Sequence, residues 1–290
     1  METIEIRVPA IFSGMTIDEL LKKWLIPRKE RYLLHMEKRL FVNGNFRNFS
    51  EKVQADAQVT IHFTEPESDL LFGDSTLVNV LYEDANLIVV NKPCGMKTHG
   101  NSPDEIELQN HVSAYCGKTV HVVHRLDRET SGAVLFAKSS FVLPILSALL
   151  EQRQIHREYS ALVAGQLKKS HFTIDKKIGR DRHDRRKRCI SPSGQPAITH
   201  VELIKNFSHS ALVSCQLETG RTHQIRVHLA DAGHPIIGDP LYNQSLPKIG
   251  ERMMLHADKM ILTLPFTFEK LEVSAKSASF DARILQEELS

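Results

Sequence analysis

Residues 122–132 read VVHRLDRETSG, an apolar pair followed by a densely charged turn, and a second apolar run over residues 133–137 follows at once. A strand, a charged turn and another strand are the means by which a sheet holds reactive groups at its rim while its body stays buried. The pattern therefore predicts a sheet whose rim carries polar chemistry at this turn.

One carboxylate, Asp127, lies at the centre of the turn, with Arg125 and Arg128 beside it in the sequence. Nearby positive charge favours the ionised form of an acid, so we expect Asp127 to be a carboxylate at neutral pH. Such a group can act as a nucleophile, bind a metal or form an ion pair. Charged loop residues usually pair or face water, and Asp127 could simply bridge Arg128 and Arg226. The turn alone leaves these roles open.

The composition is that of an ordinary globular protein. The 290 residues are 41% hydrophobic and 25% charged, which suits one large or two unequal domains with a sizeable core. No apolar run approaches the ~20 residues that span a bilayer. The N-terminus alternates polar and apolar residues, unlike a signal peptide, and the four cysteines lack CxxC spacing. We expect a cytoplasmic protein with reduced cysteines and no membrane partner.

The net charge of +2 conceals an uneven distribution of charged residues. Eight Lys or Arg stand against two acids between residues 176 and 188, and eight stand against four acids between residues 17 and 47. Local basic patches on a nearly neutral chain suit a protein that grips a polyanion at a few places. Either patch taken alone is interpreted as a solvated face.

Residues 1–66 have the pattern of a small separate module. Thr16 can cap a helix of 3.6-residue apolar period, residues 30–40 predict a second helix, and the Asn-Gly pair at residues 43–44 predicts a tight turn. A strand over residues 59–63 follows. This order loosely resembles the small RNA-binding module called the α-L motif. The alternative is a helical cap without a ligand.

A polar break at residues 65–69 separates this module from a strand-rich remainder, which we assign to a second domain of residues 74–290. Helices are predicted over residues 141–155 and after Thr219. Strands are predicted at residues 78–82, 87–91, 157–165, 198–207, 210–217 and 253–264. Many strands without an alternating strand–helix rhythm predict an α+β fold with a mixed, largely antiparallel sheet.

Three polar groups stand out where apolar elements meet loops, namely Asp127, Tyr159 and Arg226. They are far apart in sequence, so any contact among them is tertiary. A metal site needs ligands at fixed spacing, such as HExxH or paired CxxC, and the 15 histidines supply no such pattern. A GxSxG elbow, a Gly-rich phosphate loop and a dinucleotide fingerprint are also missing. We expect neither a metal nor a cofactor, and a metal-dependent hydrolase is a remote hypothesis.

The charged turn resembles the HRLDxxTSG signature of the RluA-type RNA pseudouridine synthases. Further segments similar to that family follow in order: KPCG at residues 92–95, REY at 157–159, GRTHQIRVHL at 220–229, GHP at 233–235, GDPLY at 238–242 and MLHA at 254–257. The resemblance covers about residue 77 to about residue 273. It implies a catalytic domain of pseudouridine synthase type that isomerises specific uridines of structured RNA to pseudouridine without a cofactor.

The resemblance also implies roles for individual residues. Asp127 would be the nucleophile, attacking the anomeric carbon of the sugar or assisting loss of the base through a glycal, whereas an older proposal has it add to the uracil ring. Arg226 would pair with Asp127 and keep it charged and aimed. Tyr159 would stack on the uracil, and its phenol, with an unperturbed pKa of about 10, would act through a network rather than as a free base. Arg125 would fill the gap left by the flipped nucleotide.

The remaining candidates would contact the substrate or the RNA backbone, with Lys92 and His124 open to an orienting or structural role instead. The substrate contacts are Lys92, His124, Arg125, Arg128, Thr130, Arg221, Thr222, His223 and Gln224. The contacts to the RNA backbone are Arg185, Arg186, Lys187 and Arg188.

We expect RNA as the partner, ribosomal rather than transfer RNA, and a monomeric protein. The alternative from another class is a non-catalytic RNA-binding protein of the same fold. The intact set of Asp127, Tyr159 and Arg226 favours the enzyme, because a binding module needs no nucleophile.

Overall fold

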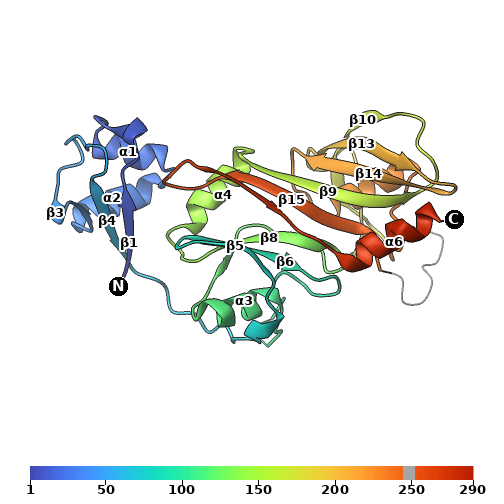
Figure 1. The fold of residues 1–290 in the computed structure, drawn as a ribbon, viewed down its shortest axis with the longest axis horizontal. Helices are drawn as coiled ribbons and strands as arrows, with labels where there is room; N and C mark the ends of the chain where they lie inside the picture. The colour runs from blue at the N-terminus through green and yellow to red at the C-terminus, as the bar shows by residue number, and fades with distance from the viewer. Residues whose placement is uncertain (103, 244–251, 290) are drawn as a thin grey trace.

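The computed structural model describes residues 1–102, 104–243 and 252–289, and one large sheet dominates it (Figure 1). Along the sheet the strands follow the order β10, β13, β14, β9, β15, β8, β6, β5, with β16 on β15 and β7 on β8. Their bounds are β5 (Val80–Glu83), β6 (Leu87–Lys92), β7 (His121–Val122), β8 (Ser131–Ala137), β9 (Ile155–Ala164), β10 (His171–Asp175), β13 (Ile198–Asn206), β14 (Ser210–Leu217), β15 (Leu255–Thr263) and β16 (Lys270–Ser274). The helices of this part of the chain are α3 (Leu108–Cys116), α4 (Leu143–Glu151), α5 (Gln224–Asp231) and α6 (Ala278–Glu288).

The strand pairing confirms the predicted fold class. Neighbouring strands of the large sheet are antiparallel, except that β8 and β15 run parallel. A short separate hairpin, β11 (Ile178–Arg180) with β12 (Arg188–Ile190), carries the basic stretch on its connecting loop. The protein is therefore α+β with a mixed, largely antiparallel sheet.

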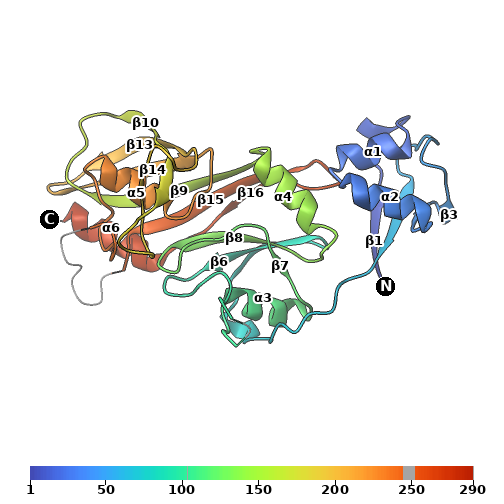
Figure 2. The same cartoon turned by 180° about the vertical axis from the view of Figure 1, so that it is seen from behind.

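The neighbouring strands β6 and β8 are covered on both faces, and their side chains alternate between two cores. Leu87 and Val89 pack in the core that contains α4, whereas Ile88 and Val90 pack in the core that contains α3. This alternation follows from the two-residue period of a strand. Figure 2 shows α3 and α4 on opposite sides of these strands. The apolar run after the charged turn, in β8, therefore anchors the turn in the interior of the protein.

Gly132, at the end of the charged turn, makes the parallel pairing possible. It pairs with Ala257 of β15, and a Cβ built on Gly132 would lie 2.2 Å from the Ala257 carbonyl oxygen. Its φ of +118° is also a conformation that other residues rarely adopt. Only glycine fits where β8 leaves the turn and meets β15.

The N-terminal module forms a small sheet of its own at one end of the molecule (Figure 1). Its elements are β1 (Glu2–Arg7), α1 (Ile17–Lys23), α2 (Arg28–Met36), β2 (Leu40–Val42), β3 (Asn45–Phe46) and β4 (Gln58–Phe63), with strand order β1, β4, β2, β3. Thr16 caps α1 as predicted, in a capping box with Glu19.

This module is packed against the rest of the chain through contacts between aromatic rings. Trp24 meets Phe266 with ring centroids 5.4 Å apart, and Phe63 meets Phe141 at 5.3 Å. Glu65, in the predicted linker, binds His121 at 2.6 Å and also accepts from the Ser140 backbone amide. The linker is thus pinned to the second domain. The division at residues 1–66 and 74–290 stays a prediction.

The predicted helices extend too far at their C-terminal ends. The sequence predicts a helix over residues 30–40, but α2 ends at Met36 because Lys38 takes a left-handed conformation with φ of 52°. Likewise α4 ends at Glu151, before Arg153 with φ of 59°, and residue 155 already begins β9. A residue in the left-handed conformation ends a helix as a C-terminal glycine would. The sequence does not indicate this conformation when the residue is Lys or Arg.

Among the described residues, the helices are all too short or too polar to cross a bilayer.

Replacing Gly132 should reveal the close approach of β8 to β15. Gly132→Ala combines a positive φ with a steric clash against backbone, and we expect the free energy of unfolding to fall by about 3 kcal/mol or more. Gly14→Ala is the matched control, because Gly14 has φ of +85° but open space around its Cβ position. Its expected cost is about 1 kcal/mol. Equal losses in urea-unfolding experiments would contradict a steric role for Gly132.

Candidate active site

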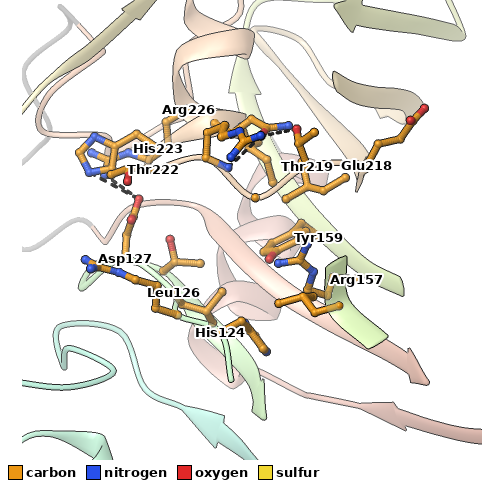
Figure 3. Close-up of a pocket in the computed structure, with 18 of the residues that line it drawn as sticks. His124, Leu126, Asp127, Arg157, Tyr159, Glu218, Thr219, Thr222, His223 and Arg226 are labelled. Atoms are coloured by element: carbon orange, nitrogen blue, oxygen red, sulfur yellow. Dashed lines mark hydrogen bonds and ion pairs between the residues drawn. The ribbon is translucent and has the colours of Figure 1, made fainter. Parts of the chain in front are cut away.

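A cavity of about 560 Å³ opens where the charged turn, β9 and the N-terminal end of α5 meet. Figure 3 shows Asp127 on one side of it and Tyr159 on the other. The predicted site residues that line it are His124, Arg125, Asp127, Thr130, Tyr159, Arg221, Thr222, His223, Gln224 and Arg226. Segments from three distant parts of the sequence therefore converge as predicted.

A single buried guanidinium, that of Arg226, holds Asp127 in position. Its Nη1 donates to Asp127 Oδ2 at 3.0 Å, across 99 positions of sequence. Its Nε and Nη2 donate to the two carboxylate oxygens of Asp239, both at 2.8 Å. Asp239 is fully buried and Arg226 is 3% exposed, whereas the Asp127 side chain keeps 19% of its surface in contact with solvent. Asp239 thus fixes the arginine, and the arginine presents the more accessible carboxylate.

The electrostatics of this triad keep Arg226 charged. Burial opposes its charge, but hydrogen bonds and charge from Asp239, with a further contribution from Asp127, outweigh that cost and raise the pKa of Arg226. The guanidinium also lies over the Tyr242 ring, 5.2 Å from its centroid. One cation stands between two carboxylates in this triad, and the further cations Arg125, Arg157 and Arg221 also line the cavity.

His223 approaches Asp127 from the other direction. Its Nε2 lies 3.7 Å from Asp127 Oδ2, and its Nδ1 shares a hydrogen bond with the Tyr242 hydroxyl at 2.9 Å. Burial lowers the pKa of His223, although Asp127 counteracts it. The residue caps α5 in a left-handed conformation with φ of 57°, which is strained for a non-glycine residue. Strain of this kind at the carboxylate is consistent with a functional position.

Tyr159 faces the cavity from β9 beside Arg157, as Figure 3 shows. Its side chain is 4% exposed, and burial raises the pKa of the phenol, with the negative charge of Asp127 adding to the shift and Arg157 opposing it. The phenol is therefore protonated at neutral pH. It can stack on a planar ring or donate a hydrogen bond, but it cannot take up a proton by itself.

His124 is buried as a neutral imidazole behind the turn. Its Nε2 accepts from the Leu135 backbone amide at 3.2 Å, so the ring proton must reside on Nδ1. Burial, with the charge of Arg157 adding to it, lowers the pKa of His124 to about 3. The residue joins the turn to β8, which fits the structural role that the sequence left open.

Lys92 lies inside the protein and outside the cavity. It is fully buried, and its Nζ donates to the carbonyl oxygens of Pro93, Met96 and Arg128 at 2.9, 2.6 and 3.2 Å. The predicted substrate contact is therefore not available to Lys92. Its ammonium group instead ties the segment after β6 to the charged turn.

Residues 219–224 form the other wall of the cavity, and Gln224 organises it. The Gln224 amide oxygen accepts from Thr219 Oγ1 and the Arg221 backbone amide, and its nitrogen donates to the Ile198 carbonyl. Gln224 is 3% exposed, so its role is to hold the loop. Thr222 is exposed at the cavity, and Thr130 is buried beside Asp127, whose carbonyl accepts from its backbone amide at 3.1 Å.

The predicted RNA-backbone contacts lie outside this cavity. Arg185 and Arg186 are exposed on the β11–β12 loop, and Arg186 pairs with Asp184 at 2.8 Å. Lys187 and Arg188 are partly buried, and the Arg188 backbone amide donates to the Tyr242 hydroxyl at 2.7 Å. Arg128 forms no ion pair with Asp127, and its Nε donates instead to the Gly95 carbonyl. The suggested Asp127–Arg128 bridge is thus wrong, whereas the Asp127–Arg226 pair is confirmed.

Three residues of the site had no role assigned from the sequence: Arg157, Asp239 and Tyr242. All three lie in segments that carry the family resemblance, namely REY at residues 157–159 and GDPLY at residues 238–242. An acid in a Gly-Asp-Pro turn is ordinarily a local turn former. Asp239 does accept from the Leu241 and Tyr242 backbone amides, so the local signal is correct but hides the contact to Arg226.

Two family models match the chain. The model described as RNA pseudouridylate synthase matches residues 86–231. The model described as RluD ribosomal pseudouridine synthase N-terminal domain matches residues 4–59. Together they cover the N-terminal module and the segments that build the cavity.

Similar proteins carry the same family name. An uncharacterized RNA pseudouridine synthase of Bacillus subtilis, YhcT, is 38% identical over 231 residues, which are 77% of this chain and 76% of that protein. Ribosomal large subunit pseudouridine synthase D of Nitrosomonas europaea is 34% identical over 281 residues, 91% and 81% of the two chains. The solved structure of human RNA Pseudouridylate Synthase Domain Containing 1 aligns with a TM-score of 0.61 and 28% identity, over 72% of this chain and 89% of that one.

The buried half of the carboxylate–arginine triad should matter for stability. Asp239→Asn leaves part of the buried Arg226 charge uncompensated, and we expect the free energy of unfolding to fall by about 3 kcal/mol. Asp231→Asn is the control, since it removes an exposed pair with Lys176 and should cost less than about 1 kcal/mol. Chemical denaturation of both variants measures the difference. Similar losses would mean that Asp239 does not hold Arg226.

The buried neutral His124 should make stability depend on pH. Below pH 6.5 the unfolded chain takes up a proton on this ring, whereas the folded protein does so only near pH 3. The folded state therefore loses about 1.4 kcal/mol per pH unit as the pH falls through this window. His124→Gln, which can still accept from Leu135, should lack that loss. A wild-type-minus-variant difference that is constant from about pH 7 to about pH 4.5 would refute the neutral-histidine assignment.

Proposed function

The chain belongs to the family of RNA pseudouridylate synthases, isomerases that convert uridine in RNA to pseudouridine, and we propose that it acts on ribosomal RNA with Asp127 as its nucleophile. The observation that carries the proposal is the contact of Arg226 with Asp127 at 3.0 Å, in a cavity that Tyr159 also lines. A carboxylate, a cation that orients it and an aromatic ring are what the reaction needs.

In the proposed reaction, a carboxylate oxygen of Asp127 bonds to the anomeric carbon of the sugar while the bond to uracil N1 breaks. The bonding electrons leave with the uracil. The base then turns, its carbon 5 bonds to the anomeric carbon, and the aspartate leaves with its electron pair. Carbon 5 loses its proton and N1 gains one, so substrate and product are isomers and no cofactor is consumed.

The other cavity residues would support these steps. Arg226, fixed by Asp239, would keep Asp127 aimed at the sugar without being consumed. Tyr159, protonated because burial raises its pKa, would stack on the uracil and steady it while it turns. Arg125, exposed next to the nucleophile, would occupy the space that the flipped nucleotide leaves in the RNA.

The match of residues 4–59 to a ribosomal pseudouridine synthase N-terminal domain supports ribosomal rather than transfer RNA as the substrate. In this module Lys23, Arg28, Lys29 and Lys38 form no ion pair with another described residue, which leaves their charge for phosphate. We propose that the module binds RNA.

Mapping pseudouridine in RNA from cells lacking the protein should reveal a missing site in ribosomal RNA. A loss confined to transfer RNA would contradict ribosomal RNA as the substrate.

We also propose that the protein works as a monomer in the cytoplasm. Asp127, Arg226 and Asp239 contact one another within the chain, so the proposed site needs no second copy. Ribosomal RNA is a cytoplasmic substrate in the bacteria from which the named relatives come.

Asp127→Asn should abolish the reaction and spare binding. The amide is nearly the same size but is no nucleophile, so release of tritium from RNA labelled at uracil carbon 5 should fall by about 10⁴-fold or more. RNA affinity should stay within about threefold, because it comes mainly from phosphate contacts. Filter binding at fixed salt measures the affinity, and Asp231→Asn is the matched control with normal activity.

Two outcomes would count against this proposal. An Asp127→Asn protein that loses binding in proportion to activity would make Asp127 a binding residue. A wild-type protein that binds ribosomal RNA but releases no tritium from it or from other cellular RNA would favour a non-catalytic RNA-binding protein of the same fold.

A further inference from the structure

A second cavity, of about 640 Å³, adjoins the first on the far side of the charged turn. Both cavities are lined by Arg125, Leu126, Asp127, His223 and Arg226. Tyr159 lines only the first, whereas Arg128 and Arg186 line only the second. Asp127 therefore stands between two adjoining spaces, and a chain molecule whose sugar lies at Asp127 would extend from one into the other.

The second cavity offers cationic groups that the protein leaves available. The side chain of Arg128 is 63% exposed; its Nε is anchored to the Gly95 carbonyl at 2.9 Å, and its nearest carboxylate oxygen, on Glu129, is 4.0 Å away. Its two terminal nitrogens form no hydrogen bond with another residue in the described ranges. The anchored Nε fixes the direction of the side chain, so the remaining donors form a preorganised anion contact.

The opposite walls of this cavity suit a base and a ribose. Pro240 and Leu241 contribute apolar surface, and His99 adds an imidazole whose Nδ1 is already bonded to the Gly100 carbonyl at 2.8 Å. Thr98 bonds through its hydroxyl to the backbone of Leu126 at 3.0 and 3.1 Å, which joins this wall to the charged turn. The cavity thus offers a cation for a phosphate, and an imidazole and apolar surface for a base, which are the parts of a nucleotide.

We propose that the second cavity is a subsite for the nucleotide next to the target uridine, and that Arg128 binds the phosphate joining the two. The inference rests on the proposed function, since it takes the target sugar to lie at Asp127. The protein would therefore bind one nucleotide adjacent to its target as well as the target itself. Arg186, 76% exposed and paired with Asp184, lies at the rim where it can meet the next phosphate.

Short inhibitors test the subsite on the full-length enzyme. Uridine and the dinucleotides ApU and UpA are compared as inhibitors of tritium release from labelled ribosomal RNA. We expect one dinucleotide to inhibit roughly tenfold more strongly than uridine, the effect of one charge-assisted phosphate contact. In Arg128→Gln this advantage should fall below about threefold, while inhibition by uridine itself stays unchanged and serves as the check on folding.

Arg182→Gln is the matched control, because Arg182 is exposed on the same basic loop as Arg186 but lines neither cavity. It should keep the full advantage of the dinucleotide. The subsite is overturned if neither dinucleotide exceeds uridine, if Arg128→Gln keeps the advantage, or if both variants lose it equally. Absence of tritium release by the wild type would instead overturn the proposed function, so the two failures are distinguishable.

Discussion

The contact of one buried guanidinium with two carboxylates is the constraint on which the site depends. Arg226 must be charged inside the protein, which is possible only because Asp239 binds two of its nitrogens. Its third nitrogen is left for Asp127, so the proposed nucleophile is held by a single hydrogen bond to this arginine, at 3.0 Å. A carboxylate bound at one oxygen keeps its other oxygen for chemistry. Asp239 thereby compensates the buried charge of Arg226, while the third nitrogen of the arginine stays free to orient Asp127, the proposed nucleophile.

The same triad organises the surrounding surface. Asp239 also accepts from the backbone amide of Tyr242, and the Tyr242 hydroxyl contacts both His223 and the Arg188 backbone. One buried acid thus connects Asp127 to the strained cap of α5 and to the basic β11–β12 loop. On the opposite side, Lys92 binds three backbone carbonyls and fixes the turn from behind. Buried charged groups thus hold the charged turn from both sides.

Much of this could be predicted from the sequence, and the omissions have physical causes. Continuous apolar runs located strands β6 and β8 correctly, and the motif segments identified Asp127 and Arg226 as partners. Asp239 was missed because its turn-forming signal is local and its contact to Arg226 is tertiary. Lys92 was offered as a substrate contact, but its ammonium group is buried and binds backbone carbonyls. A sequence does not reveal whether a cation faces water or backbone. Helix ends were misjudged at Lys38 and Arg153, whose left-handed conformations no glycine announced.

The most direct test of this account is the rate of tritium release by Arg226→Lys under single-turnover conditions. Lysine keeps the positive charge but lacks the planar fork that contacts both carboxylates at once. If the arginine acts by geometry, the rate should fall by about a hundredfold or more while RNA binding and folding are retained. A rate close to that of the wild type would mean that charge alone suffices, and would contradict the view that Asp239 and Arg226 together aim Asp127.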